Sequence, residues 1–123
     1  MAFSSFEEMP VWQKGMDLAQ RVHEITERLP RKEDYGLTSQ IRRSALSVPG
    51  NIAEGFGRKH TKDKLNFYYG SRGSLAETKS HLLYGQRVGY FKQAECGPFL
   101  GLVDEIWKEL NALIRTLYRR TQP

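Results

Sequence analysis

With 123 residues, 39% of them hydrophobic and 27% charged, the chain suits one water-soluble domain that buries its core without metal or disulfide crosslinks. The single cysteine excludes an internal disulfide, and the absence of both an apolar run of ~18 residues and a secretion signal argues against a membrane location and predicts a cytoplasmic protein. The formal net charge is +5, and residues 58–92 hold 8 basic and 2 acidic residues, so one side of the molecule is expected to be positive.

The first predicted helix covers about residues 10–29. Apolar residues recur in it at steps of three and four from Val11 to Leu29, and charged residues fill the opposite face. Pro10 suits the first turn of a helix, whereas Pro30 cannot continue one. These signals predict a helix with one buried stripe.

A turn over residues 30–36 leads into a second predicted helix over about residues 37–56. Its apolar stripe stays in phase on both sides of Pro49, so the helix is expected to continue past the proline. Because proline lacks an N–H and its ring clashes with the preceding turn, a kink is expected at this position. Gly55 and Gly57 are expected to end the helix.

Two longer helices are predicted to complete the chain, over about residues 61–89 and 98–119. Thr61 is expected to be the N-cap of the first of them, and the second is apolar over a wider face than one core requires. Long helices with short connections are typical of a bundle. We therefore predict an all-α fold in which residues 1–123 form a single antiparallel, up-down four-helix bundle.

Polar residues on the second and third helices suggest a structural role. Arg72 and Lys79 fall within the apolar stripe of the third helix, where a cation must be paired or must reach solvent. Glu54 is expected to accept from a cation on another helix or subunit, so that Glu54→Ala would destabilise the fold or the oligomer while Glu24→Ala would do neither. A solvated charged face is the alternative. The residues assigned to this structural or oligomer set are Gln40, Arg43, Pro49, Asn51, Glu54, Arg72, Glu77 and Lys79.

A basic loop over residues 58–64 enters the third helix, and Phe67, Tyr68 and Tyr69 follow it directly. Cations with nearby aromatic rings are suited to phosphate contact and base stacking. A solvated surface loop without a ligand is the alternative. The residues assigned to nucleic-acid binding, with three arginines of the last helix included, are Arg58, Lys59, His60, Lys62, Lys64, Arg115, Arg119 and Arg120.

No pattern of catalytic or ligand-binding residues stands out, so we expect no enzyme, no metal and no cofactor. The three histidines share no i,i+4 spacing with one another or with Cys96. Residues 55–59 combine glycines with basic residues, but they lack the spacing of a phosphate-binding loop and no strand precedes them. Ser71 and Ser74 have no general base beside them in the sequence.

Four segments resemble one protein family in their order and spacing: VWQK (11–14), YGLTSQIRR (35–43), PGNIAEG (49–55) and RGSLAE (72–77). The family is named after the protein encoded in intervening sequences of bacterial 23S ribosomal RNA genes. The accessory variability protein of diversity-generating retroelements belongs to the same broad group. The resemblance covers roughly residues 6–91, and NIAEG is its most specific part.

The resemblance implies an antiparallel four-helix bundle that assembles into a ring of five chains. For the retroelement relative, the resemblance implies that this ring is basic, binds nucleic acid and engages a reverse transcriptase. We therefore hypothesise a non-enzymatic homo-oligomer, a pentamer, that binds RNA or DNA through a basic surface. The alternative is an oligomeric scaffold that binds a partner protein, for example a reverse transcriptase, without a nucleic-acid role of its own.

Overall fold

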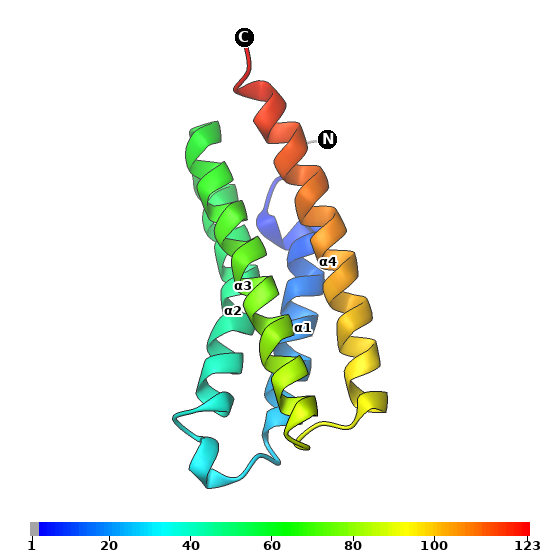
Figure 1. The fold of residues 1–123 in the computed structure, drawn as a ribbon. Helices are drawn as coiled ribbons and strands as arrows, with labels where there is room; N and C mark the ends of the chain where they lie inside the picture. Colours follow the sequence, from blue (N-terminus) through cyan, green and yellow to red (C-terminus); the bar gives the residue numbers. More distant parts are fainter. Residues whose placement is uncertain (1–2) are drawn as a thin grey trace.

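Four helices pack side by side in the computed structural model, which describes residues 3–123 (Figure 1). No strand is present in that part of the chain. The prediction of an all-α four-helix bundle is therefore confirmed. The elements are η1 (Phe6–Glu8), α1 (Pro10–Thr26), η2 (Arg31–Glu33), α2 (Leu37–Gly57), α3 (Thr61–Arg87) and α4 (Gln93–Arg120).

Each helix packs against its neighbours in the chain, and α1 also packs against α4, which closes the bundle. The largest of these contacts joins α2 and α3. In Figure 1 the α2–α3 connection and the end of α4 lie at one end of the bundle, and the α1–α2 and α3–α4 connections lie at the other. Segments that are far apart in the sequence, residues 58–64 and 115–120, therefore share one end of the molecule.

The core follows the apolar stripes that the sequence predicts for the four helices. Burial of such side chains, at roughly 1.5–3 kcal/mol each, is the main stabilising contribution to a bundle of this kind. Side chains with no measurable exposure come from every helix: Leu18, Val22, Ile41, Val48, Ile52, Leu75, Leu82, Ile106 and Leu110.

The contact between α2 and α3 includes small hydroxyl residues that are completely buried. The Ser44 and Thr78 hydroxyl oxygens lie 2.9 Å apart, and the Ser71 hydroxyl donates to the Val48 carbonyl at 2.8 Å. Because each of these hydroxyls has a partner, it is buried without the penalty of an unpaired polar group. The α3 stripe therefore passes through Ser71 and Thr78, so the prediction that the neighbouring Arg72 and Lys79 belong to it is wrong.

Pro49 is buried within α2, which continues unbroken from Leu37 to Gly57. A Cβ atom added at Gly15 would lie 3.3 Å from Pro49 Cβ, so the glycine allows α1 to approach α2 closely at the proline. The continuation of the helix past the proline agrees with the in-phase stripe. The kink at Pro49 stays a prediction.

The helix ends differ from the predicted ones at three places. Helix α1 ends at Thr26 rather than near residue 29, because the residue before Pro30 is restricted away from the helical conformation. Helix α4 begins at Gln93 rather than at Pro98, since the Glu95 carboxylate accepts the Lys92 backbone N–H at 2.8 Å. The prediction that Thr61 is the N-cap of α3 is wrong, because Thr61 is the first residue of the helix and His60 occupies the N-cap position.

The Glu95 carboxylate also joins α4 to the end of α1. Both of its oxygens lie 2.5 Å from guanidinium nitrogens of Arg28, which additionally donates to the Tyr90 carbonyl at 3.2 Å. The Arg28 guanidinium and the Lys92 N–H together lower the pKa of Glu95 from 4.5 to about 2. The ionised carboxylate is thus the form that the folded state stabilises.

Stability in acid should depend on Glu95. Because its folded pKa is depressed, its contribution is complete above the unfolded value of 4.5 and is lost as the pH falls toward about 2. Glu95→Gln should therefore lower the thermal midpoint at pH 6 and flatten its fall between pH 5 and pH 2.5. Thermal melts across this range test this, with Glu24→Gln on the exposed face of α1 as the control. If the thermal midpoints of wild type and Glu95→Gln fell by the same amount between pH 5 and pH 2.5, the assignment would be contradicted.

The Thr38 hydroxyl is buried and has no hydrogen-bond partner among residues 3–123. Thr38→Val removes this unpaired group and keeps the shape of the side chain, so we expect the free energy of unfolding to rise by about 1 kcal/mol. The matched control is Thr26→Val, which removes a buried hydroxyl that donates to the Val22 carbonyl at 2.7 Å and accepts from Arg42 Nε at 2.7 Å. Urea unfolding should show a higher free energy of unfolding for Thr38→Val and a lower one for Thr26→Val. A loss of stability in Thr38→Val would refute the prediction.

Candidate nucleic-acid interface

The fold brings two basic segments together, and we call residues 58–64 and 115–120 the basic end. It consists of the α2–α3 connection, the first turn of α3 and the last two turns of α4 (Figure 1). Within these two segments, the single acidic residue is Asp63. The cations near the carboxyl end of α4 also interact favourably with the helix dipole. The basic side chains are Arg58, Lys59, His60, Lys62, Lys64, Arg115, Arg119 and Arg120.

Two of these cations have partners within the chain. Arg58 lies 3.3 Å from the Glu54 carboxylate, and its guanidinium carbon lies 4.7 Å from the centre of the Phe67 ring. Lys64 donates to the Phe56 carbonyl at 2.8 Å and to the Gly55 carbonyl at 3.3 Å, so it caps the carboxyl end of α2. Burial at this position lowers the pKa of Lys64.

The other cations of the basic end are available to a ligand. Lys59, Lys62, Arg119 and Arg120 are exposed and form no side-chain hydrogen bond or ion pair within the part of the chain that the structure describes, and the same is true of Arg115. Exposed cations without acidic partners are the groups that contact phosphates. Lys64 differs from them, because its charge is already used to stabilise α2.

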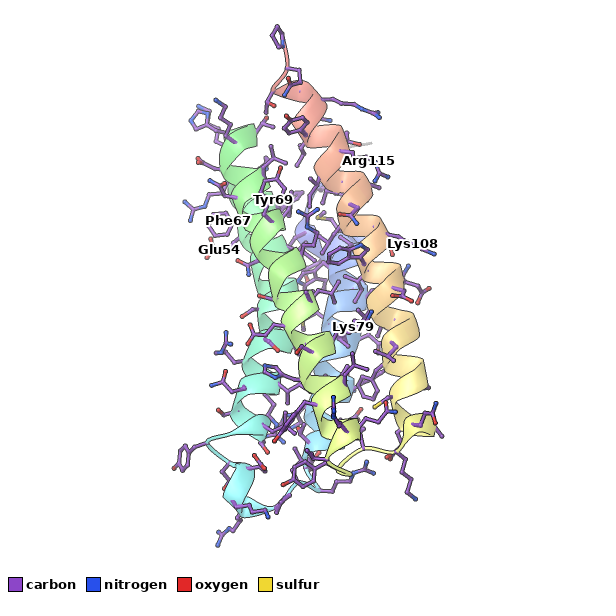
Figure 2. The ribbon with its side chains drawn as sticks, in the orientation of Figure 1. Glu54, Phe67, Tyr69, Lys79, Lys108 and Arg115 are labelled. Atoms are coloured by element: carbon purple, nitrogen blue, oxygen red, sulfur yellow. The ribbon has the colours of Figure 1, made fainter. Side chains whose placement is uncertain are left out.

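The three aromatic residues that follow the basic loop point in different directions, because successive residues of a helix are rotated by about 100°. Tyr68 is 2% exposed and belongs to the core, and its burial raises the pKa to about 12. Phe67 is half-buried against Arg58. Tyr69 is 39% exposed, and Figure 2 shows it on the part of α3 that faces α4. Tyr69 is thus the member of the group that can contact a ligand base.

An open groove of about 350 Å³ lies between α3 and α4 next to the basic end, and we call it the aromatic groove. Arg72 crosses it, with its guanidinium carbon 5.3 Å from the Tyr69 ring centre and 5.7 Å from that of Trp107. Its Nη1 donates to the Asn111 side-chain oxygen at 2.8 Å. Arg72 is thus held by two rings and an amide, and Glu54, which was expected to accept from a cation of another helix, is not among its partners in residues 3–123. The lining residues are Tyr69, Arg72, Ile114, Arg115, Tyr118 and Arg119.

The predicted buried network around Glu54 does not form among residues 3–123. Glu54 is exposed, and its partner is Arg58 just beyond the end of the same helix rather than a cation of another helix. Lys79 is exposed and unpaired among the described residues. Within one chain, Glu54→Ala is therefore expected to have a small effect, under ~0.5 kcal/mol. Pairing of Glu54 with a second subunit stays a prediction.

Other members of the structural set, Gln40, Arg43, Asn51 and Glu77, form polar contacts within α2 and between α2 and α3. Arg43 pairs with Glu77 of α3 at 2.5 Å and donates to the Gln40 side chain at 3.3 Å. The Asn51 amide donates to the Ser47 carbonyl at 2.9 Å. Because the Arg43–Glu77 ion pair is partly exposed, it contributes about 0–1 kcal/mol.

Neither a metal cluster nor a membrane helix is found in residues 3–123. No group of three or more His, Cys, Asp or Glu side chains there is arranged to hold a metal ion. No helix of this region combines the length and the apolar character that crossing a bilayer requires. Cys96 is buried, which raises the pKa of its thiol.

The chain matches a protein-family model and is similar in fold to a solved structure. A family model described as 23S rRNA-intervening sequence protein matches residues 7–112. A crystal structure from Bacteroides thetaiotaomicron, described as a protein with unknown function from the S23 ribosomal protein family, superposes with a TM-score of 0.76 at 22% identity. The alignment covers 85% of this chain and 97% of the other, and at this identity it shows the shared fold. No curated protein matches the sequence.

Proposed function

Because the chain belongs to the family of 23S rRNA-intervening sequence proteins, we propose that it is a non-enzymatic oligomer that binds RNA or DNA through its basic end. The observation that carries this proposal is the meeting of residues 58–64 and 115–120 at one end of the bundle. These two segments hold seven lysines and arginines against one acid. Such a surface suits the phosphate backbone, whose recognition depends on charge more than on base sequence.

The proposed assembly is a closed ring of five chains. Apolar side chains lie exposed on two different sides of the bundle, which suits a ring whose neighbours meet through unlike faces. Met16 and Leu46 line a groove beside α1 and α2, while Leu83 and Trp107 line one between α3 and α4. A ring of five would carry a formal charge of 5 × 5 = +25. Light scattering should report about five times the chain mass of 14.2 kDa, and a monomer at micromolar concentration would refute the ring.

A charge-reversal experiment tests the binding surface. Changing Lys59, Lys62, Arg119 and Arg120 together to glutamate should weaken nucleic-acid binding about 100-fold or more, because these side chains are free to neutralise phosphates. Wild-type affinity should also fall by ~10³-fold between 50 and 200 mM salt if about six phosphates are neutralised. Fluorescence anisotropy with labelled RNA and DNA measures both effects.

The matched control reverses four exposed cations at the opposite end of the bundle, namely Arg31, Lys32, Arg87 and Lys92. It changes the net charge by the same amount, since each variant replaces four positive charges with four negative ones. The control should retain most of the affinity. Equal losses in the two variants would mean that net charge alone governs binding and that the basic end is not the binding surface.

A second candidate function is a scaffold that binds a partner protein, for example a reverse transcriptase, without a nucleic-acid role. The observation that favours it is the apolar groove formed by Ala76, Leu83, Val103 and Trp107, with Lys79 and Asp104 at its sides. The absorbance of the natively purified protein separates the two candidates. Bound nucleic acid raises the ratio of absorbance at 260 nm to that at 280 nm, and sequencing of the co-purifying strands would identify the target.

A further inference from the structure

The aromatic groove exposes more aromatic surface than its position between two packed helices requires. Tyr69 is 39% exposed, Tyr118 is 53% exposed, and Trp107 beside them is 41% exposed. Rings of this kind are usually buried against the core or against another chain, because their faces are apolar. Here the Tyr69 and Tyr118 rings line an open groove from opposite sides, one from α3 and one from α4.

The charge of the groove restricts what it can bind. Three of its six lining residues are arginines, namely Arg72, Arg115 and Arg119, and none is acidic. None of the three has a carboxylate partner among residues 3–123. An occupant must therefore bring negative charge together with a flat apolar surface, which a nucleotide does.

Arg72 is held in place before a ligand arrives. The hydrogen bond to Asn111 and the contacts with the Tyr69 and Trp107 rings restrict the position of its guanidinium group. The bond to Asn111 uses Nη1, so the other nitrogens of the guanidinium retain N–H donors for a ligand. A fixed donor beside an exposed ring is suited to an acceptor on the edge of a base or to the phosphate next to it.

The groove is continuous with the basic end, because Arg115 and Arg119 belong to both. In Figure 2, Tyr69 and Arg115 lie at a similar height of the bundle on the two helices that border the groove. A strand whose phosphates contact the basic end would therefore bring its bases to the tyrosines. Bases of a duplex are paired and stacked inside the helix, so their faces could not reach these rings.

We propose that the aromatic groove binds an unpaired base, stacked on Tyr69 or Tyr118, of a single-stranded RNA or DNA. This inference rests on the proposed nucleic-acid function and adds to it the form of the strand and the residues that distinguish it. Arg72 donates to the base or its phosphate, and Arg115 and Arg119 contact the flanking phosphates. The basic end alone would bind single strands and duplexes through their phosphates only.

The test compares three labelled probes against the full chain by fluorescence anisotropy. They are an oligothymidylate of about 20 nucleotides, the same backbone with abasic sites, and a DNA duplex of equal length. Stacking of a base on an aromatic side chain contributes roughly a tenfold change in affinity. We expect the affinity for the intact strand to be at least about 10-fold higher than that for the abasic strand at the same salt concentration. The double variant Tyr69→Leu, Tyr118→Leu should abolish this difference and leave duplex affinity unchanged.

Two further variants keep the result interpretable. Tyr69→Phe with Tyr118→Phe retains the rings and should retain the preference for the intact strand. Tyr84→Leu removes an exposed tyrosine at the other end of α3 and should have no effect. Salt-dependent binding with equal affinity for intact and abasic strands would overturn the stacking site and leave the proposed function standing. Failure of every probe to bind would overturn both.

Discussion

Replacing Gly85 with alanine is expected to lower the free energy of unfolding by about 2–3 kcal/mol. A Cβ atom at this position would lie 2.4 Å from Phe91 Cε2 and 2.5 Å from Phe91 Cδ2, well inside contact distance. The ring is 2% exposed, and the Gly85 carbonyl accepts the N–H groups of Tyr90 and Phe91 at 2.8 and 3.2 Å. The chain reverses tightly here, so the ring cannot retreat without leaving the core.

Gly73 supplies the matched control, since it lies in the same helix and a Cβ atom there would meet nothing within 4 Å. Alanine is favoured over glycine in a helix by up to ~1 kcal/mol, so Gly73→Ala should stabilise the chain or leave it unchanged. Urea unfolding of the two variants gives the comparison. Equal stabilities would mean that Phe91 adapts to the added methyl group and that Gly85 is not required for the turn.

Lys64→Glu is expected to destabilise the fold by about 3 kcal/mol. Lys64 makes charged hydrogen bonds to the Phe56 and Gly55 carbonyls, each of which contributes ~1.5–3 kcal/mol when its donor is ionised. A carboxylate at this position would face two carbonyl oxygens and the negative end of the α2 dipole. The variant therefore loses favourable contacts and gains repulsion.

Lys62→Glu is the control for this substitution, because Lys62 is exposed in the same turn of α3 and has no partner among the described residues. It should change stability by less than about 0.5 kcal/mol. Thermal melts and urea unfolding of the two variants measure the difference, and similar values would show that the Lys64 cap contributes little. For the same reason, charge reversals aimed at binding should leave Lys64 unchanged, so that unfolding is not read as lost affinity.

The α3 stripe shows why the core could be predicted only in part. Leu65, Leu75 and Leu82 lie in the buried stripe that their spacing predicts. Spacing alone could not decide between Ser71 and Arg72, because adjacent residues are both compatible with a helix face of this width. The choice depends on the Val48 carbonyl of α2, to which the Ser71 hydroxyl donates. Only the packed neighbour supplies that acceptor.

The start of α4 was missed for a related reason. Proline is a strong local signal for the first turn of a helix, and the predicted helix began at Pro98. The actual start is five residues earlier, where Glu95 accepts the Lys92 N–H and pairs with Arg28. The local signal for this start, a glutamate three residues after the N-cap position, was present in the sequence. The ion pair of Glu95 with Arg28, 67 positions earlier in the chain, could not be inferred from the sequence.

The sequence by itself determined the class of fold and the existence of a basic segment, because apolar periodicity and charge are properties of consecutive residues. It also indicated the family through four short segments in fixed order, which the match over residues 7–112 confirms. The tertiary structure alone decided which cations are free and which, like Lys64, are engaged in a cap. It also decided that Tyr69 and Tyr118 line one groove, since their proximity depends on how α3 and α4 pack rather than on any spacing along the chain.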